Sequence, residues 1–302
     1  MSETVDRRRG SAAFDFEAIG ERLRAYRMAR RLRSEEVAER LSISRAAVYN
    51  LERGEIVKID TLEKLASLFG VTLPNLLGVE AEYHDSAVSY FERMRQLESR
   101  SKRVLANFDP ISFLLTSEAY PKILRNMLEE SVPHELTDEG SARLNSDVLK
   151  ILTARRRFFE ESRPSILSLI GARQVEQMLH HGLVGRLGLP AGVQLERKLA
   201  ARSEVAHMIS VLESDPIGVQ IGIVVENSPN ENFQIFEEPG GVHVAVSPFR
   251  LGELPNVRSG VASITTSPDA VGMYRRLIGR LWDGAAKGRD GADVLRRLLG
   301  NT

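Results

Sequence analysis

Residues 32–54, LRSEEVAERLSISRAAVYNLERG, decide the fold of the first part of this chain. Val37, Ala38 and Leu41 recur at helical spacing, which predicts an apolar face on a first short helix. Ala38 is small and lets a second helix cross closely, and Ser42 ends the first helix. The stretch therefore predicts two helices joined by a tight turn.

The second helix of this pattern begins after Ser44, whose hydroxyl can accept a hydrogen bond from an unpaired backbone amide. Val48 and Leu51 are its inward residues, and Gly54 closes it at a position that favours a positive φ. The side chains left facing outward are Arg45, Ala46, Tyr49, Asn50 and Arg53. Such a helix is typical of a unit that lies in the major groove of duplex DNA.

Both flanks extend the helical pattern. Residues 16–31, FEAIGERLRAYRMARR, predict an opening helix, and residues 59–78, IDTLEKLASLFGVTLPNLLG, predict two closing helices. Together with residues 32–54, which end in Glu-Arg-Gly, they resemble the Cro/C1-type helix-turn-helix family, also called the XRE family. The resemblance covers roughly a fifth of the chain. It implies an all-α, five-helix, lambda-repressor-like DNA-binding domain over residues 16–79.

The resemblance also implies which side chains contact DNA. Phosphate contacts would come from Ser44, Arg53 and Lys58. Base contacts would come from Arg45, Ala46 and Asn50, with Tyr49 near a base or the backbone. Arginine can bind the O6 and N7 of guanine, asparagine can pair with the N6 and N7 of adenine, and an alanine methyl suits thymine. Arg27 and Glu52 match a family pair that forms a buried salt bridge, whose role would be to fix the motif.

The start of the first motif helix departs from the family pattern. The family usually has Thr or Ser followed by Gln, and Arg33 and Ser34 occupy those positions in this chain. Either Ser34 serves as the cap one residue late, or Arg33 contacts a phosphate instead. The resemblance therefore does not carry over the phosphate contact of the missing Gln.

Six arginines and no acidic residue lie between Arg22 and Arg33. A stretch of one sign beside a recognition helix suits a polyanion. Residues 1–79 hold fourteen Lys and Arg against twelve Asp and Glu, so we expect a local positive field and a moderate dependence of affinity on salt. The alternative is a helical bundle whose motif no longer binds DNA, and the charge pattern argues against it.

At 302 residues the chain has room for two or three domains, so we expect a multidomain protein. Without cysteine it has no disulfide or iron–sulfur cluster, and we expect neither metal nor cofactor. The start, MSETVDRRRGSAAFDF, lacks the apolar segment of a signal peptide, and no run approaches the roughly 18 apolar residues of a membrane span. We therefore expect a cytoplasmic protein without a membrane partner. Residues 1–15 are expected to be a flexible arm, in which Arg7–Gly10 form a tail or contact DNA.

Residues 82–107 carry apolar side chains at helical spacing and a polar face dense in Arg and Glu. We expect one long helix, within a linker or dimerisation segment over residues 80–107. Two interpretations stay open: the helix pairs with its twofold mate, or it packs onto its own C-terminal domain. The apolar stripe is not a strict heptad, which argues against a long coiled coil.

Residues 108–302 predict a larger α+β domain with a mostly antiparallel sheet. Its expected strands are residues 111–115, 165–170, 217–226, 232–238, 242–247 and 260–267. Its expected helices are residues 117–130, 141–161, 172–182, 193–213, 268–288 and 292–299. We assign this domain to effector sensing, to dimerisation, or to both.

One loop of this domain looks suited to binding. Ser247–Gly260 follows a strand and combines two arginines, an asparagine, two prolines and two glycines. Arg250, Asn256 and Arg258 are the candidate effector-binding residues, because arginines can hold a carboxylate or phosphate bidentately. The alternative is an ordinary surface loop or a dimer contact. Trp282, the one tryptophan, is expected in the core rather than stacked on a ligand.

No catalytic pattern stands out, so we expect no enzyme. The one Ser-x-x-Lys, Ser99 to Lys102, falls on a charged helix, and no His-Glu-x-x-His is present. Adjacent residues on a helix point about 100° apart, so His180 and His181 would make a poor metal pair.

These patterns together predict a sequence-specific, homodimeric transcription regulator, with repression favoured over activation. It would bind an inverted-repeat operator in double-stranded DNA and sense a small-molecule effector through its C-terminal domain. One alternative is an antitoxin-like or scaffold protein whose C-terminal half binds another protein. A third class is an enzyme with a DNA-binding anchor.

Overall fold

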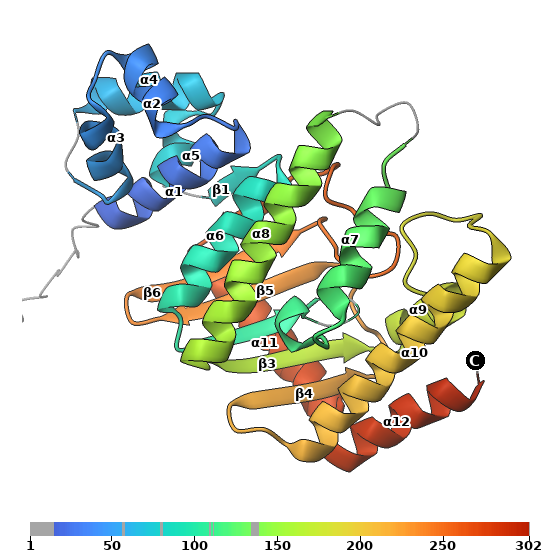
Figure 1. Ribbon diagram of the computed structural model, residues 1–302. Helices are drawn as coiled ribbons and strands as arrows, with labels where there is room; N and C mark the ends of the chain where they lie inside the picture. Colours follow the sequence, from blue (N-terminus) through green and yellow to red (C-terminus); the bar gives the residue numbers. More distant parts are fainter. Residues whose placement is uncertain are drawn as a thin grey trace, which may run out of the picture. The chain divides into compact units, whose positions relative to one another are not determined.

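The computed structural model describes residues 15–55, 58–78, 81–108, 110, 112–133 and 139–301. The chain forms two compact units, Met1–Val79 and Glu80–Thr302, called unit 1 and unit 2 below (Figure 1). The predicted N-terminal arm lies outside the described residues, apart from Asp15. The Asp15 carboxylate caps the first helix by accepting a hydrogen bond from the Ala18 amide at 3.0 Å.

Unit 1 is helical throughout its described residues. Its helices are α1 (Phe16–Ala29), α2 (Ser34–Leu41), α3 (Arg45–Glu52), α4 (Ile59–Phe69) and α5 (Leu73–Leu77). One apolar core joins them, and the inward residues expected from the sequence, among them Val37, Val48 and Leu51, are buried in it. The prediction of a helix-turn-helix flanked by an opening helix and two closing helices is confirmed.

Two glycines let α1 and the end of α3 approach closely. A Cβ atom at Gly20 would lie 2.7 Å from the backbone oxygens of Leu51 and Glu52. Gly54 has a φ of 84°, as predicted for the residue that closes α3, and a Cβ atom there would lie 2.7 Å from the Glu17 backbone. Each side of this contact therefore requires a residue without a side chain.

Unit 2 is built on one mixed sheet. In spatial order its strands are β1 (Ala81–His84), β7 (Ala262–Thr265), β6 (Gly241–Ser247), β5 (Asn232–Glu238), β2 (Arg103–Asn107), β3 (Ser165–Gly171), β4 (Val219–Val224) and β8 (Ala286–Lys287). Most neighbours are antiparallel, as predicted, but β2, β3 and β4 run parallel to one another. Parallel neighbours need long crossover connections, and helices supply them in this unit.

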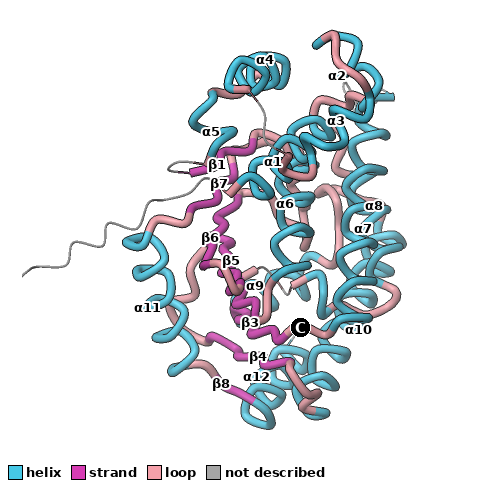
Figure 2. The backbone as a smooth tube through the Cα atoms, turned by 90° about the vertical axis from the view of Figure 1, so that its left-hand side faces the viewer, coloured by secondary structure: helices cyan, strands magenta, loops and turns pink. Residues whose placement is uncertain are grey.

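Helices cover the two faces of the sheet unequally (Figure 2). Among the described residues, α11 (Pro268–Gly284) is the helix on one face. On the other face lie α6 (Ala87–Arg100), α7 (Tyr120–Glu130), α8 (Glu139–Ser162), α9 (Ala172–His181), α10 (Ala191–Ser214) and α12 (Gly288–Asn301). Ile278 of α11 closes an apolar core with strand residues such as Leu105 and Phe233. Unit 2 is therefore a three-layered α+β structure.

The prediction of one long helix over residues 82–107 is wrong. This segment forms β1, then α6, then β2. Ser86 caps α6 through a hydrogen bond from the Val88 amide, and Ser101 ends the helix. Tyr83 and Val104 belong to the two strands, yet they continue the helical spacing of α6 and so concealed both strands.

Of the two interpretations left open for this segment, the structure shows packing onto its own C-terminal domain. Most of α6 is buried, including charged residues. Arg93 donates to both carboxylate oxygens of Glu82 at 2.8 and 2.9 Å. Arg155 of α8 donates to both oxygens of Glu98 at 2.8 and 2.6 Å. The Arg- and Glu-rich face of this helix is therefore internal and paired, as buried charges require.

Two smaller expectations also fail. Instead of a strand over residues 111–115, the described residues there include a 3₁₀ turn, η1 (Phe113–Leu115). The helix expected over residues 268–288 is shorter, because α11 ends at Gly284. Residues 286–287 form the edge strand β8, and α12 follows it from Gly288. The strands predicted over residues 165–170, 232–238 and 242–247 are confirmed to within one residue.

Candidate functional site

Helix α3 presents the predicted contact residues on its outward face. Ser44 is its N-cap, and the hydroxyl accepts a hydrogen bond from the Ala47 amide at 3.0 Å, as predicted. Val48 and Leu51 anchor the opposite face in the core. The predicted contact residues Arg45, Ala46, Tyr49 and Arg53 are exposed, and Asn50 is half-buried. The buried residues therefore fix the position of α3, and its contact residues face outward.

Side chains on this face already contact one another. Arg45 Nε lies 2.9 Å from Glu35 Oε1 of α2. The guanidinium carbon of Arg53 lies 5.5 Å from the centroid of the Tyr49 ring. Both members of the ion pair are well exposed, so the pair contributes at most about 1 kcal/mol to the stability of unit 1. Arg45 can therefore exchange the Glu35 carboxylate for another acceptor at low cost.

α2 begins one residue earlier than a cap at Ser34 would allow. Arg33 is its N-cap, and Ser34 is the first helical residue. The Arg33 amide donates to the Glu36 carboxylate at 2.6 Å, so a residue of the helix itself supplies the capping contact. The interpretation of Ser34 as the cap is therefore wrong. Arg33 is exposed, and so is Lys58, the N-cap of α4.

Arg27 forms the predicted pair with Glu52. The two Nε–Oε1 and Nη2–Oε2 distances are 2.5 and 3.1 Å, and the side chains are only 15% and 8% exposed. Arg27 also donates to the Leu32 carbonyl at 2.9 Å. One guanidinium therefore ties together α1, the end of α3 and the turn before α2.

Two further arginines of the basic stretch stabilise helix ends. Arg22 is buried and donates to two carbonyls at the end of α5, both at 2.8 Å. Arg30 donates to the Phe69 carbonyl, at the end of α4, at 2.6 Å. Carbonyls at a helix C-terminus have no partner within the helix, so these contacts satisfy them. Arg22 and Arg30, like Arg27, therefore make hydrogen bonds inside unit 1. Their carbonyl acceptors are neutral, so both guanidinium charges remain part of the local positive field.

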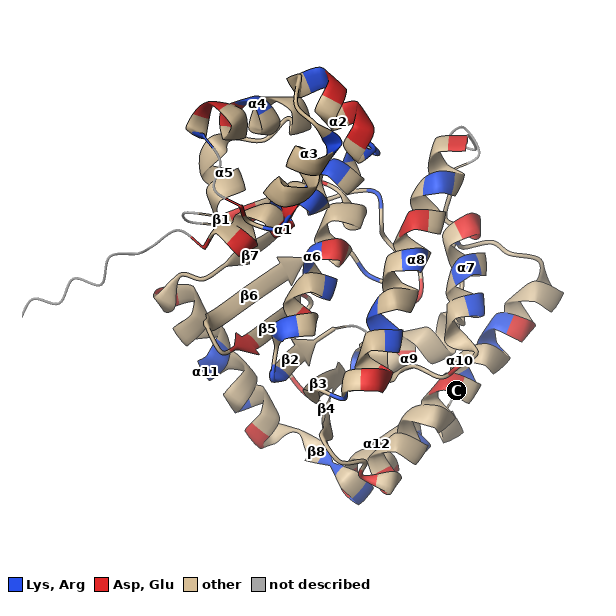
Figure 3. Cartoon of the chain, turned by 60° about the vertical axis from the view of Figure 1, so that its left-hand side comes forward, with Lys and Arg blue, Asp and Glu red and all other residues tan. Residues whose placement is uncertain are grey.

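Acidic residues dominate α2 (Figure 3). The helix carries Glu35, Glu36 and Glu39 against the single basic residue Arg40. Glu35 and Glu36 lie in its first turn, and the Glu36 carboxylate already accepts a hydrogen bond from the Arg33 amide. These negative charges oppose the approach of a phosphate group to this end of the helix.

All three candidate residues of the loop proposed for effector binding make hydrogen bonds within unit 2, and Arg250 Nε donates to the Leu254 carbonyl at 3.2 Å. Asn256 Nδ2 donates to the carbonyls of Pro248 and Ser259 at 3.2 and 2.7 Å. This side chain therefore holds the two ends of the loop together. Arg258 donates to Asn145 Oδ1 at 2.9 Å, and burial lowers the pKa of its guanidinium. These bonds use part of the hydrogen-bonding capacity of Asn256 and Arg258, and the effector-binding role of the three residues stays a prediction. Arg250 lines a cavity.

The loop does border a cavity. A space of about 240 Å³ lies between Arg250 and its neighbours on one side and α9 on the other. Gln174, Gln177 and His181 form the α9 wall. No sequence pattern predicts these three residues at a cavity, because their spacing resembles an ordinary polar helix face and gives no sign of the loop opposite.

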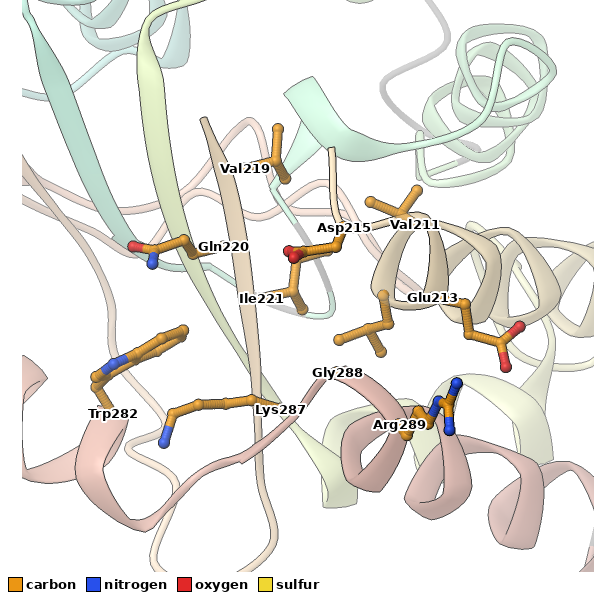
Figure 4. A pocket seen from close by; sticks show the side chains of 11 residues that line it. Val211, Glu213, Asp215, Val219, Gln220, Ile221, Trp282, Lys287, Gly288 and Arg289 are labelled. Carbon is orange, nitrogen blue, oxygen red and sulfur yellow. The ribbon is translucent and has the colours of Figure 1, made fainter. Parts of the chain in front are cut away.

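A larger cavity, about 630 Å³, lies among the ends of α10 and α11, β4 and the start of α12 (Figure 4). Its wall includes Trp282, which was expected in the core and is half-buried at the border of the apolar core, against which it packs. Two of its charged side chains have partners within unit 2: Lys287 Nζ lies 4.9 Å from the centroid of the Trp282 ring, and Glu213 pairs with Arg296. Asp215 and Arg289 also line this cavity.

Residues 18–77 match the family model described as a helix-turn-helix domain. No curated protein matches the chain. Among solved structures, the archaeal chromatin protein TrmBL2, described as showing a novel mode of DNA binding, aligns with a TM-score of 0.31 and 9% sequence identity. That alignment covers 87% of this chain and 92% of TrmBL2. The family match lies within unit 1.

Within the described residues, no helix is long and apolar enough to cross a membrane. The same residues contain no cluster of three or more His, Asp or Glu side chains arranged to hold a metal ion.

Proposed function

We propose that this chain is a transcription regulator that binds a specific duplex DNA sequence through the outward face of α3. The observation that carries the proposal is the helix-turn-helix over residues 18–77, whose second helix carries an exposed guanidinium at Arg45 and a half-buried carboxamide at Asn50. These groups match the hydrogen-bonding edges of guanine and adenine in the major groove. The polar residues around them contact the phosphate backbone of the DNA, which positions the protein but does not distinguish one base sequence from another.

The regulator acts as a homodimer on an inverted repeat, and repression is favoured over activation. One short helix has few side chains that reach base edges, so a twofold dimer doubles the sequence read. Half-sites should then lie about one helical turn apart, or a multiple of it. Gel-shift selection on genomic fragments, followed by sedimentation of the complex, tests this arrangement. Tight binding of a monomer to unpaired half-sites would refute the dimer.

Alanine variants test the assignment of base contacts. Arg45→Ala and Asn50→Ala should each cost roughly 1–3 kcal/mol of binding and relax the preference at one base pair. Arg280→Ala removes an exposed arginine from α11 in unit 2 and serves as the matched control, with affinity unchanged. A uniform loss over all sequences would assign Arg45 and Asn50 to the phosphate backbone instead.

We also propose that unit 2 senses a small molecule and performs no catalysis. Its support is the cavity beside Arg250, which lies under the loop expected from the sequence. Binding of a small molecule there would change operator affinity. Gel shift with and without the bound molecule tests the coupling, and unchanged operator affinity at saturation would contradict it.

One observation favours a second candidate function, an antitoxin-like or scaffold protein that binds another protein through unit 2. Leu195 and Leu199 lie four residues apart on α10 and are 60% and 57% exposed, and Leu187 just before the helix is 65% exposed. Neighbouring exposed leucines on a helix are typical of a protein-binding face. Recovery of one partner in equal amount with the full chain, and its loss in Leu195→Ser/Leu199→Ser, would favour this function.

A further inference from the structure

Glu35 of α2 is an acidic side chain beside the outward face of α3. Its Oε1 lies 2.9 Å from Nε of Arg45, the first residue of α3. The outward row of α3 itself carries no carboxylate, because the one acidic residue of the helix, Glu52, is 8% exposed and paired with Arg27. Glu35 is therefore the negative charge in contact with the arginine expected to read a base.

The local structure of α2 does not require a carboxylate at position 35. An acidic residue in the first turn favours a helix, but Glu36 already supplies one, and its carboxylate accepts a hydrogen bond from the Arg33 amide. The Glu35 side chain is 53% exposed and contributes little to packing. For binding to DNA through charge alone, Glu35 is unfavourable, because it repels phosphate oxygens and competes for the Arg45 guanidinium.

The pair of Arg45 and Glu35 matches the major-groove edge of one G·C base pair. Guanine presents two acceptors, N7 and O6, and the paired cytosine presents a donor at N4. The protein presents the complementary groups side by side, with N–H donors on Arg45 and a carboxylate acceptor on Glu35. The spacing also agrees, since O6 and N4 are joined by a hydrogen bond of about 2.9 Å and the two protein atoms lie 2.9 Å apart.

The other base pairs present these groups differently. In an A·T pair the thymine O4 acceptor replaces the cytosine N4 donor, and the adenine N6 donor replaces the guanine O6 acceptor. A carboxylate that faces O4 and a guanidinium that faces N6 each lose a hydrogen bond, and the reversed pairs exchange the two positions. An arginine alone already prefers guanine. The carboxylate adds a penalty against any acceptor at the neighbouring position, which is a way to gain specificity by repulsion.

We propose that Glu35 is a specificity-determining residue, which accepts a hydrogen bond from cytosine N4 while Arg45 binds the O6 and N7 of the paired guanine. Both side chains are exposed and their ion pair is weak, so the terminal nitrogens of Arg45 turn to guanine while Glu35 stays beside them. On unrelated sequences the same carboxylate holds Arg45 back from the phosphates. The proposal rests on the regulator function, because it assigns one base pair of the operator which that function requires.

Gel-shift titrations of the full chain test the assignment. An operator is first selected from random duplexes, and the loss of preference in Arg45→Ala locates the base pair that Arg45 reads. Duplexes with each of the four base pairs at that position are then titrated with the wild type, Glu35→Gln and Glu39→Gln. Glu39→Gln is the matched control: it removes one negative charge from another exposed residue of α2, about one helical turn beyond Glu35.

We expect the located pair to be G·C and to be preferred by the wild type at least about tenfold over the other three. Glu35→Gln should narrow this preference at least about threefold, because a glutamine amide can also donate to thymine O4. The same variant should bind an unrelated duplex more tightly and with a steeper salt dependence, since Arg45 is released toward phosphate. Glu39→Gln should leave the preference among the four pairs unchanged.

The outcomes separate two failures. A located pair other than G·C, or an equal preference in Glu35→Gln and the wild type, would overturn the role of Glu35 and leave the regulator function intact. Equal narrowing in Glu35→Gln and Glu39→Gln would reduce the effect to net charge and would overturn the role as well. A wild-type protein that binds all duplexes equally would refute the regulator function itself.

Discussion

Replacing Gly20 by alanine tests whether α1 packs as closely on the end of α3 as the structure shows. Gly20 lies inside α1, where alanine is ordinarily more favourable than glycine by roughly 1 kcal/mol. Sequence alone therefore predicts stabilisation. The structure reverses the sign, because the added Cβ atom would lie 2.7 Å from backbone atoms of Leu51, Glu52 and Gly54.

The magnitude follows from what must move. Backbone atoms cannot rotate away as the end of a long side chain can, so the two helices have to separate. Overpacking of this kind costs about 1–3 kcal/mol, and three simultaneous close contacts place Gly20→Ala near the upper end. After the gain of about 1 kcal/mol in helix propensity, we expect unit 1 to lose roughly 1–2 kcal/mol of stability. The outward residues of α3 should shift as well, which weakens DNA binding.

Hydrogen exchange of the full chain, read by mass spectrometry, localises the effect. Peptides from residues 16–55 should exchange roughly 5–30 times faster in Gly20→Ala, while peptides of unit 2 stay unchanged. Gly279→Ala is the matched control, because Gly279 lies inside α11 with nothing within 4 Å of an added Cβ atom. It should slow exchange in α11. If Gly20→Ala also slows exchange, the close packing of α1 on α3 is refuted.

Three further predictions concern paired and buried groups. Arg27→Met should destabilise unit 1 by about 1–3 kcal/mol, since it leaves the Glu52 carboxylate largely buried without its cation; a chemical melt with no shift would contradict this. Burial lowers the pKa of His84 from its ordinary 6.5, so the unfolded chain binds the proton more readily and unit 2 should lose stability as the pH falls below about 6.5. Urea melts at pH 7.5 and 5.5 should show a smaller difference for His84→Gln than for the wild type, and an equal difference would exclude His84 as the cause. Arg258→Ala should cost about 1 kcal/mol of stability through its lost bond to Asn145, and an unchanged urea midpoint would show that the bond contributes nothing.

Local signals in the sequence were enough for unit 1. Ser44 is a polar cap before an amphipathic helix, and Gly54 follows that helix, so both roles depend on neighbours within one or two turns. The pair of Arg27 and Glu52 was recognised through the resemblance and not through spacing. The capping roles of Arg22 and Arg30 were missed, because their acceptors are carbonyls 39 to 55 residues away and carry no side-chain signature.

In unit 2, patterns among neighbouring residues predicted some of the strands but not the arrangement of the sheet. The alternation of β-branched residues over residues 217–226 located β4, and β5 and β6 coincide with the strands predicted on either side of the turn at Pro239–Gly241. It did not locate β1 and β8, which have four and two residues and are too short for periodicity to be distinguished from a helix. The parallel arrangement of β2, β3 and β4 depends on which strands meet in space, and α9 faces the loop around Arg250 for the same reason. The candidate cavity could therefore be assigned to a loop, but its opposite wall could not.

The pairing of β1 with β7 has a consequence for biosynthesis. Ala81 begins the first strand of unit 2 and pairs in register with Thr265. This strand can therefore pair only after residues near the far end of the chain have been synthesised. Contacts so distant in sequence slow folding, whereas the short-range contacts of a helical unit form quickly. We expect residues 16–78 to be folded on the ribosome while β1 is still unpaired. An interrupted translation product would then carry a folded unit 1 without unit 2.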